Sequence, residues 1–399
     1  MRTTIGVALL VVVGAATAHE NASRVSASRR TGFLARLGVI RLKPDATYTR
    51  PDATNATATS PQPKPAGAAN STLTAVAGIK VGHHTLTERP TGCTVILVDG
   101  DAVGGVSQRG GAPGTRETDL LNPVNHVQKV NAIVLAGGSA FGLDAASGVV
   151  RWLDERDIGY DARVAKVPIV PAAILFDLGV GGKPKVRPTA ECGYAAAAAA
   201  TTDPVAEGSI GAGAGATVGK FAGPTRMTKA GIGTAAITMA DGTVVAALVA
   251  VNAAGDIIDP ATGRVVAGVR SADGKGFADA RIILRSGVTG RPVAPRPVEN
   301  TTIGVVATSA TLTKVQALKV AQMAHDGFAR AISPVHTPGD GDTIFALATG
   351  NDATPADDQR MGMIGALAAE VMADAIVRAA TQATSAAGIP ALRDLPAAR

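Results

Sequence analysis

From residue 73 onward the sequence alternates short β-branched runs with longer amphipathic patterns, and this alternation limits the folds open to the chain. The short runs are bounded by Gly, Pro and Asp, as is typical of buried strands. They cover residues 94–98, 132–135, 167–170, 244–251, 303–307 and 343–348. Apolar residues at helical spacing predict three helices, over residues 142–155, 312–332 and 361–380. We therefore expect strands covered on both faces in one layered α/β or α+β domain.

The side chains available for this core are small. Aromatic residues make up only 3% of the chain, whereas it contains 47 glycines and long Ala-rich runs. Such a core must be built from small and β-branched side chains, which let sheets and helices pack at close range. With 46% hydrophobic and 18% charged residues the chain has the composition of a globular protein, so disorder is not expected for its main part.

The first 74 residues have a different character. Residues 1–18 contain Arg2, a short apolar run and an Ala-x-Ala site, which predict a signal peptide and a secreted or periplasmic protein. The apolar run is too short to anchor the chain in a membrane. Residues 19–74 are rich in proline and lack a sustained apolar period, as in a flexible linker. The sequence therefore predicts a single folded domain over residues 75–399.

Charge and cysteine content narrow the classes of partner. Residues 1–75 carry nine basic and three acidic side chains, which accounts for the whole formal net charge of +6. The remaining chain is formally neutral and has no second long apolar run, so neither a nucleic-acid nor a membrane partner is expected. Cys93 and Cys192 are too few for a disulfide framework. They can pair or stay buried and reduced, and the second is the favoured interpretation.

The segment around Thr301 is the leading candidate for chemistry. A Pro-rich connector over residues 285–300 leads into Asn300-Thr301-Thr302 at the start of an apolar strand. A hydroxyl at this junction can attack the carbonyl of Asn300, and hydrolysis of the resulting ester frees the α-amine of Thr301. A terminal amine has a pKa of about 7.7–8.0 and is a usable base near neutral pH. After cleavage between Asn300 and Thr301, one residue would supply both nucleophile and base.

Four other residues are candidates for the same site. Asp340 and Asp342 lie two residues apart just before a predicted strand, where both carboxylates could orient the amine. Asn252 ends another strand and offers an amide NH₂ of the kind that stabilises an oxyanion. Lys220 closes a glycine-rich run and could supply a fixed positive charge, although Lys229 lies close by in the sequence.

Taken singly, these signals also have ordinary structural interpretations. A Thr-Thr pair before a strand is typical of β-structure, and an Asp-x-Asp loop is typical of a turn. The run ending at Lys220 fails as a phosphate-binding loop and the Asp340 loop fails as a calcium loop, because each lacks a required residue. No metal or cofactor is therefore expected. His325 and His336 are expected to be structural, with His336 near enough to the Asp loop to tune it.

In combination, the segments resemble the L-aminopeptidase/D-esterase peptidase family, which also includes β-peptidyl aminopeptidases and 6-aminohexanoate-oligomer (nylon-oligomer) hydrolases. The resemblance extends over about residues 73–380. The matching stretches are residues 78–83, 109–119, 134–144, 167–178, the glycine-rich run ending at Lys220, residues 251–252, the Thr301 segment and the Asp340 loop. Several stretches in the same order are more specific than any single motif.

The resemblance implies a precursor cut into an α chain ending at Asn300 and a β chain, residues 301–399, that remain associated. It also implies an α+β fold, a four-layer αββα sandwich similar to N-terminal nucleophile hydrolases but with different connectivity, and a homo-oligomer, a tetramer by family resemblance. The family's catalytic roles carry over residue by residue. They give Thr301 as nucleophile, Asp340 and Asp342 as orienting carboxylates, Asn252 as oxyanion donor and Lys220 as active-site lysine.

Within that family, the nucleophile and the carboxylate pair separate two branches. Aminopeptidase members look to have serine as the nucleophile and a Ser-x-Glu pair downstream. Threonine as the nucleophile with an Asp-x-Asp pair resembles the nylon-oligomer hydrolases. This chain follows the second pattern, although Ser309 stands where Asn is expected. The expected substrate is a small peptide or amide, and a natural amide with an extended aliphatic or β-amino unit fits as well as a synthetic oligomer.

Two other functions remain open at this point. An acyltransferase resembling ornithine acetyltransferase would share the fold and the self-released threonine, but would transfer acyl groups to an amine in preference to water. A non-catalytic binding protein on the same scaffold would stay as one uncut chain on a denaturing gel.

Overall fold

The computed structural model describes residues 70–287, 300–351 and 355–395. The signal peptide expected at residues 1–18, residues 19–69 of the expected linker and residues 288–299 of the Pro-rich connector lie outside the described residues. Residues 70–74, at the end of the expected linker, are part of the folded structure, where Leu73 is fully buried in a hydrophobic cluster.

A nine-stranded sheet forms the centre of the fold, in the order β10-β11-β14-β16-β2-β4-β7-β3 with β1 paired to β2. Its strands are β1 (Ile79–Thr85), β2 (Gly92–Gln108), β3 (Thr115–Arg116), β4 (Lys129–Ala136), β7 (Ala172–Ile174), β10 (Ile232–Thr238), β11 (Val244–Asn252), β14 (Thr301–Thr308) and β16 (Thr343–Ala348). The α-helices are α1 (Ala145–Asp154), α2 (Ala190–Ala198), α3 (Ala280–Arg285), α4 (Lys314–Ala331) and α5 (Asp358–Thr381).

Short elements complete the described chain. Small sheets are formed by β5 (Tyr160–Asp161) with β6 (Lys166–Val167), by β8 (Thr217–Val218) with β9 (Thr228–Lys229), and by β12 (Asp256–Ile258) with β13 (Val265–Ala267) and β15 (Ile332–Ser333). The 3₁₀ helices are η1 (Leu73–Ala75), η2 (Asp119–Leu121), η3 (Ser139–Asp144), η4 (Gly211–Gly213), η5 (Pro224–Arg226) and η6 (Leu392–Asp394).

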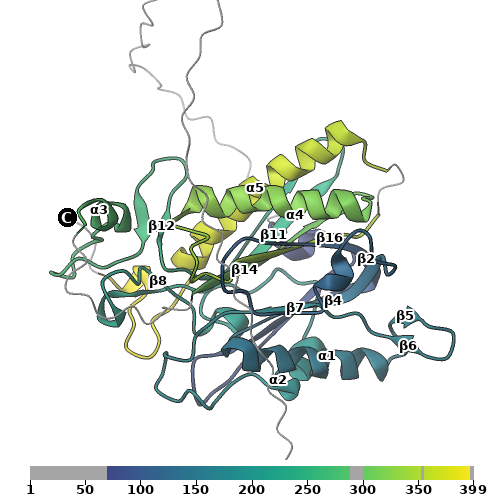
Figure 1. The fold of residues 1–399 in the computed structure, drawn as a ribbon, viewed down its shortest axis with the longest axis horizontal. Coiled ribbons are helices and arrows are strands. Elements are labelled where there is room, and N and C mark those ends of the chain that lie inside the picture. Colours follow the sequence, from purple (N-terminus) through teal and green to yellow (C-terminus); the bar gives the residue numbers. More distant parts are fainter. Residues whose placement is uncertain (1–69, 288–299, 352–354, 396–399) are drawn as a thin grey trace, which may run out of the picture. The chain divides into compact units, whose positions relative to one another are not determined.

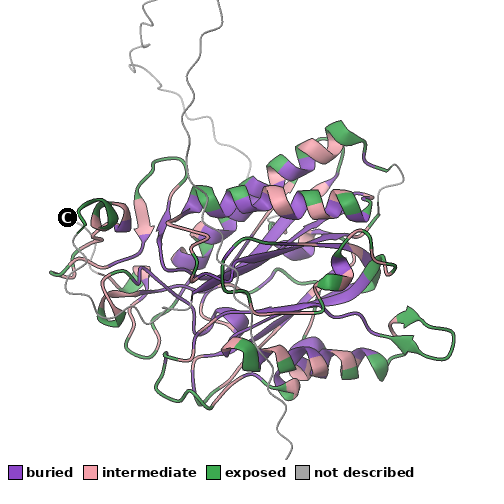
Figure 2. Cartoon of the chain, in the orientation of Figure 1, coloured by how far each residue is buried: buried purple, intermediate pink, exposed green. Residues whose placement is uncertain are grey.

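The central sheet is bent into two layers through the long strand β2. The first half of β2 pairs with β1 and β4, its second half pairs with β16, and the register with β4 shifts between Leu97 and Ala102. Alternate residues of the two layers then face each other, so that Ile96 and Ile133 share one buried cluster with Leu248 and Phe345. An apolar cluster therefore fills the space between the layers, and Figure 2 shows the central strands of both layers as buried.

Helices cover the two outer faces (Figure 1). The opposite side chains of β11, β14 and β16 pack against α4 and α5, and those of β2 and β4 pack against α1 and α2. The order of layers is thus helix, sheet, sheet, helix. This confirms the expected four-layer αββα sandwich. Within the described residues, none of the helices combines the length and apolar character needed to span a membrane.

The small-residue composition is explained by how closely the helices approach. A Cβ atom on Gly148 of α1 would lie 1.7 Å from the carbonyl oxygen of Ala190, and one on Gly193 of α2 would lie 1.8 Å from that of Ala145. The two helix backbones are therefore in direct contact, which no larger residue at these positions would permit.

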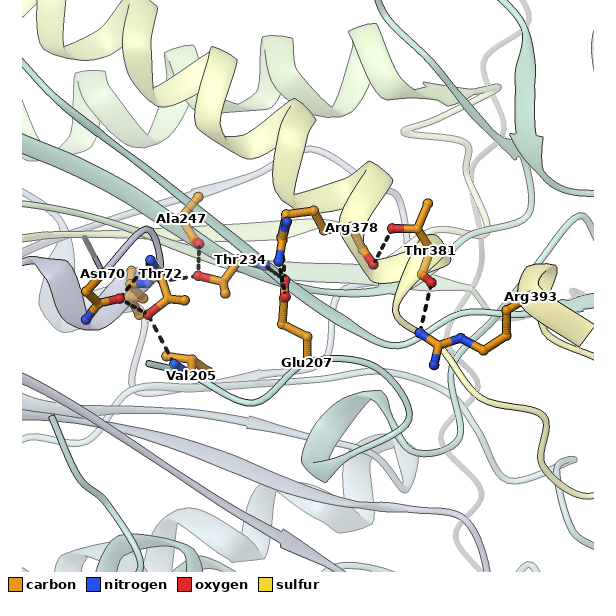
Figure 3. Close-up of polar contacts among 10 residues, drawn as sticks. Asn70, Thr72, Val205, Glu207, Thr234, Ala247, Arg378, Thr381 and Arg393 are labelled. Carbon is orange, nitrogen blue, oxygen red and sulfur yellow. Dashed lines mark hydrogen bonds and ion pairs between the residues drawn. The ribbon is translucent and has the colours of Figure 1, made fainter. Parts of the chain in front are cut away.

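A polar network holds the start of the described chain against β10, β11 and α5 (Figure 3). The backbone N–H of Leu73 donates to Thr234 Oγ1 at 2.9 Å, and that hydroxyl donates to the carbonyl of Ala247 at 2.7 Å. Glu207 accepts from the backbone N–H of Thr234 at 2.9 Å and from Arg378 Nε at 2.8 Å. Segments distant in the sequence are thus joined at this edge of the sheet.

Most predicted elements are confirmed, and one strand is wrong. The strand predicted over residues 167–170 is absent, because β6 ends at Val167 and β7 begins at Ala172. Pro168 and Pro171 lie in the interval, and proline cannot donate a backbone hydrogen bond to a neighbouring strand. The helix predicted from residue 142 starts as the 3₁₀ helix η3 and becomes α-helical only at Ala145.

The favoured interpretation of the cysteines as reduced thiols is also wrong. Cys93 of β2 and Cys192 of α2 are joined by a disulfide. Both residues are buried, as expected. The two cysteines are 99 residues apart in the sequence, so the sequence alone did not indicate that α2 packs on β2, the strand that contains Cys93.

Candidate active site

Three strand ends bring the predicted site residues together. Asn252, the last residue of β11, is paired with Thr301, the first residue of β14. On the other side, β14 runs parallel to β16, and Ile303 is paired with Thr343 directly after Asp342. Because β11 ends at the edge where β14 and β16 begin, Asn252, Thr301 and the Asp loop meet there.

The Thr301 hydroxyl lies against the bond predicted to break. Thr301 Oγ1 donates to the carbonyl oxygen of Asn300 at 2.5 Å, and Thr301 is only 3% exposed. Asn300 is equally buried, and its backbone N–H donates to the carbonyl of Gly339 at 3.1 Å. The predicted nucleophile and the predicted scissile peptide are therefore in contact within the core of the domain.

Asp342 is tied to the nucleophile strand on one side and to a histidine on the other. Its Oδ1 accepts from the backbone N–H of Thr302 at 2.8 Å. Its Oδ2 accepts from the backbone N–H of His336 at 3.2 Å and lies 2.8 Å from His336 Nδ1. The expected proximity of His336 to the Asp loop is confirmed, and the contact is direct.

Asp340 lies in the same loop in a less polar environment. Its Oδ2 accepts from the backbone N–H of Thr337 at 2.7 Å, while its Oδ1 is buried and has no hydrogen-bond partner in the described chain. Burial, followed by repulsion from Asp342, raises the pKa of Asp340 above its ordinary value. Asp340 therefore takes up a proton more readily than an ordinary aspartate.

Lys220 and Asn252 form a buried pair beside Thr301. Lys220 Nζ donates to Asn252 Oδ1 at 2.9 Å and to the Asn252 carbonyl at 3.3 Å. Burial lowers the pKa of Lys220 to about 7, an effect that the nearby charges of Asp340 and Asp177 oppose. The Asn252 Nδ2 donates to the carbonyl of Phe176 at 2.8 Å, so its amide group has a fixed orientation.

Lys229 is the second lysine considered for this position. It is fully buried, and its Nζ donates to the carbonyl oxygens of Gly213, at 3.1 Å, and Ala230. These partners belong to the glycine-rich run and to the segment before β10, whereas Lys220 binds Asn252 directly. Of the two lysines, the geometry favours Lys220 for the active-site position.

Sequence reasoning missed the buried groups that fix the Phe176 carbonyl, to which Asn252 donates. Arg89 and Asp177 form an ion pair at 2.9 Å in which both side chains are fully buried. Asp177 also accepts from the Thr91 hydroxyl at 2.6 Å and from the backbone N–H of Gly138 at 2.9 Å. This fixes the residue next to Phe176, whose carbonyl holds Asn252. A single Asp within an apolar run gave no signal of this role.

Comparisons with known proteins identify the family of this chain. The sequence profile of peptidase family S58 matches residues 71–392. The chain belongs to peptidase family S58. An uncharacterized aminopeptidase of Mycobacterium tuberculosis (strain ATCC 25618 / H37Rv) is 44% identical over 81% of this chain and 97% of its own length. A 6-aminohexanoate-oligomer endohydrolase of Kocuria sp. (strain KY2) is 33% identical over 76% of this chain and 84% of its own length.

Solved structures of similar fold support the architecture of this S58 peptidase. A Burkholderia sp. beta-aminopeptidase has a TM-score of 0.60 and 24% identity, covering 80% of this chain and 89% of that one. The L-aminopeptidase D-Ala-esterase/amidase of Ochrobactrum anthropi, described as a variant of the Ntn hydrolase fold, has a TM-score of 0.60 and 20% identity, with coverages of 81% and 89%. Family membership confirms the expected class of enzyme, a hydrolase of peptide or amide bonds.

Proposed function

We propose that this S58 peptidase is made as a precursor that cuts its own Asn300–Thr301 bond, and that the freed Thr301 then hydrolyses amide bonds in small peptides or amino-acid oligomers. The observation that carries the proposal is the 2.5 Å contact between Thr301 Oγ1 and the carbonyl oxygen of Asn300. A buried hydroxyl held against the preceding peptide bond is the arrangement from which an internal threonine becomes a terminal one.

In the mature enzyme the freed amine of Thr301 would take the proton from its own hydroxyl as that hydroxyl attacks the substrate carbonyl. Asp342 and Asp340 would orient this amine. Asp342 Oδ1 already accepts from the backbone N–H of Thr302, and Asp340 Oδ1 is buried without a hydrogen-bond partner among the described residues. Lys220 would keep Asn252 in place through the 2.9 Å contact, and Asn252 would stabilise the oxyanion when its NH₂ exchanges the Phe176 carbonyl for the substrate.

The substrate class is proposed from the branch. Threonine with Asp-x-Asp supports an amide with an extended aliphatic or β-amino unit, and the relatives of this chain carry both aminopeptidase and 6-aminohexanoate-oligomer endohydrolase names. We further propose a homo-oligomer, a tetramer by family resemblance. Sedimentation equilibrium of the processed protein tests the assembly, and a monomer mass would contradict it.

Substitution of the nucleophile tests the proposed function. On a denaturing gel, the wild-type protein should give two chains, Thr301→Ala one uncut chain, and Thr301→Ser two chains at a reduced rate. Hydrolysis of amino-acid anilides and of 6-aminohexanoate oligomers should follow the same order. Thr302→Val is the matched control, because its buried hydroxyl has no hydrogen-bond partner in the described chain. Division of the Thr301→Ala variant at the same bond would refute the proposal.

A further inference from the structure

The carbonyl oxygen of Asn300 accepts a second hydrogen bond, from the main chain. The backbone N–H of Gly341 donates to it at 2.9 Å, while the backbone N–H of Asn300 donates to the carbonyl of Gly339 at 3.1 Å. Asn300 is thereby paired with Asp340 in a parallel bridge that continues the alignment of β14 and β16. The carbonyl that must be attacked is therefore fixed by the loop that carries the two predicted carboxylates.

We propose that the main-chain N–H of Gly341 is the oxyanion donor for self-cleavage of the Asn300–Thr301 bond. This rests on the proposed function. As Thr301 Oγ bonds to the Asn300 carbonyl carbon, the carbonyl π electrons move to the oxygen that Gly341 already holds. When the intermediate collapses, the C–N bond breaks and the hydroxyl proton ends on the Thr301 nitrogen. Water then hydrolyses the ester, giving the Asn300 carboxylate and restoring the Thr301 hydroxyl.

The side chain expected to stabilise an oxyanion is otherwise engaged in the uncut chain. Asn252 Nδ2 donates to the carbonyl of Phe176 at 2.8 Å, and its Oδ1 accepts from Lys220 and from the backbone N–H of Thr217. The structure thus assigns separate donors to the two reactions, Gly341 to the self-cleavage and Asn252 to substrate hydrolysis.

A glycine is required at position 341 for the loop to come this close. A Cβ atom there would lie 2.6 Å from the carbonyl oxygen of Ala112 and 2.8 Å from Thr301 Oγ1. The loop is fixed around it, since the backbone N–H of Ala112 donates to the carbonyl of Asp340 at 2.8 Å and Thr343 Oγ1 donates to the carbonyl of Gly341 at 2.9 Å. The donor is therefore preorganised before the reaction begins.

An amide-to-ester exchange at position 341 removes this N–H and nothing larger. Full-length precursor with glycolate in place of Gly341 should cleave more slowly by about 10²–10³-fold, the cost of losing one oxyanion donor. The ester also weakens the Asp340 carbonyl as an acceptor for Ala112. Lactate in place of Ala112 is the matched control, because it deletes that same hydrogen bond and leaves the Gly341 N–H intact. The control should cleave at close to the wild-type rate.

The outcomes separate this assignment from the proposed function. Equal slowing of both ester variants, or wild-type cleavage by the position-341 ester, would overturn the role of Gly341 while leaving Thr301 in place. Absence of cleavage at Asn300–Thr301 in the wild-type protein would overturn the proposed function itself. If the position-341 ester does not fold, hydrogen exchange of the Thr301→Ala precursor decides. A protected Gly341 amide supports the assignment, and an amide that exchanges at the unprotected rate refutes it.

Discussion

His336 connects the predicted catalytic carboxylate to a small group of buried rings. Its Nδ1 lies 2.8 Å from Asp342 Oδ2, and its ring lies 4.9 Å from that of His325 and 5.9 Å from that of Phe328. Asp342 in turn holds the backbone N–H of Thr302, next to the nucleophile. The orientation of Asp342 therefore depends on His336, which agrees with the expectation that this histidine lies near enough to the Asp loop to tune it.

Removing the His336 ring should slow catalysis without unfolding the protein. We expect His336→Ala to lower the hydrolysis rate by on the order of tenfold, because a hydrogen bond to a charged group contributes about 1.5–3 kcal/mol. His336→Asn should restore most of the rate, since Asn keeps a donor and tolerates the positive φ of 57° at this position. Steady-state kinetics of the two processed variants make the test, and equal rates for both would refute the positioning role.

Lys229 should make stability depend on pH in the alkaline range. Burial lowers its pKa to about 7, whereas an unfolded lysine keeps a pKa of 10.5. Between these values the unfolded chain binds more protons, so the free energy of unfolding rises with pH by up to about 1.4 kcal/mol per pH unit for each such lysine. Below pH 7 the destabilisation is complete.

Urea unfolding of the uncut Thr301→Ala protein at pH 7, 8 and 9 measures this slope. Lys229→Met should reduce it, and the remaining slope should come from Lys220, whose pKa is lowered in the same way. An unchanged slope in the Lys229→Met variant would show that Lys229 is not buried as a titrating group.

Site residues with reactive side chains could be predicted from the sequence, whereas the main-chain donors and acceptors of the site could not. Thr301, Asp340 and Asp342 have side chains of recognisable chemistry at strand ends, and the structure brings them together with Asn252 and Lys220. The Gly341 N–H and the Phe176 carbonyl have no sequence signature. Their position depends on strand pairing, so only the fold could identify them.

Among the elements, β2 shows most clearly where the sequence pattern misleads. Its prediction stopped at residue 98 because the following residues, 99–105, contain Asp and Gly that are typical of a turn. The strand nevertheless continues to Gln108 and pairs with β16. Gly105 is needed because a Cβ there would lie 2.6 Å from the backbone of Ala317 in α4. What looked like a turn is the bend that joins the two sheet layers.

The pairing of β14 with β11 and of β16 with β2 predicts that the two chains stay together after cleavage. β14 is flanked by β11 of the α chain, and β16 is paired with β2 of the α chain. In addition, α4 and α5 of the β chain bury a shared apolar cluster with β11. Processed protein should therefore elute as one species from a sizing column in native buffer and separate into two chains only in denaturant. Two separate peaks in native buffer would contradict this packing.

The Cys93–Cys192 disulfide should stabilise the domain. It clamps α2 to β2 and closes a loop with a sequence separation of 99 residues. A disulfide of this kind contributes about 2–4 kcal/mol, mainly by restricting the unfolded chain. Urea unfolding of the Thr301→Ala protein with and without dithiothreitol measures the contribution. A Cys93→Ala/Cys192→Ala variant is the control and should be insensitive to the reductant. If the unfolding midpoint of the Thr301→Ala protein with both cysteines does not move under reduction, the bond is refuted.

For the molecule as a whole, the periodic pattern predicted a layered domain, but the four-layer αββα order came from the family resemblance. The reason is that apolar alternation gives the two faces of each strand without saying which layer each strand joins.

Export remains a proposal. A disulfide is typical of oxidising compartments, and cleavage after Ala18 would make His19 the first residue. N-terminal sequencing of the exported protein checks it, and a retained Met1 would contradict it.

Intact mass spectrometry of the purified, active wild-type protein tests the central claim most directly. The account predicts a smaller chain that begins at Thr301 and extends to the C-terminus, and a larger chain that ends at Asn300. Active protein with an unbroken backbone between Asn300 and Thr301 would contradict it, because Thr301 would then have no amine of its own to serve as the base.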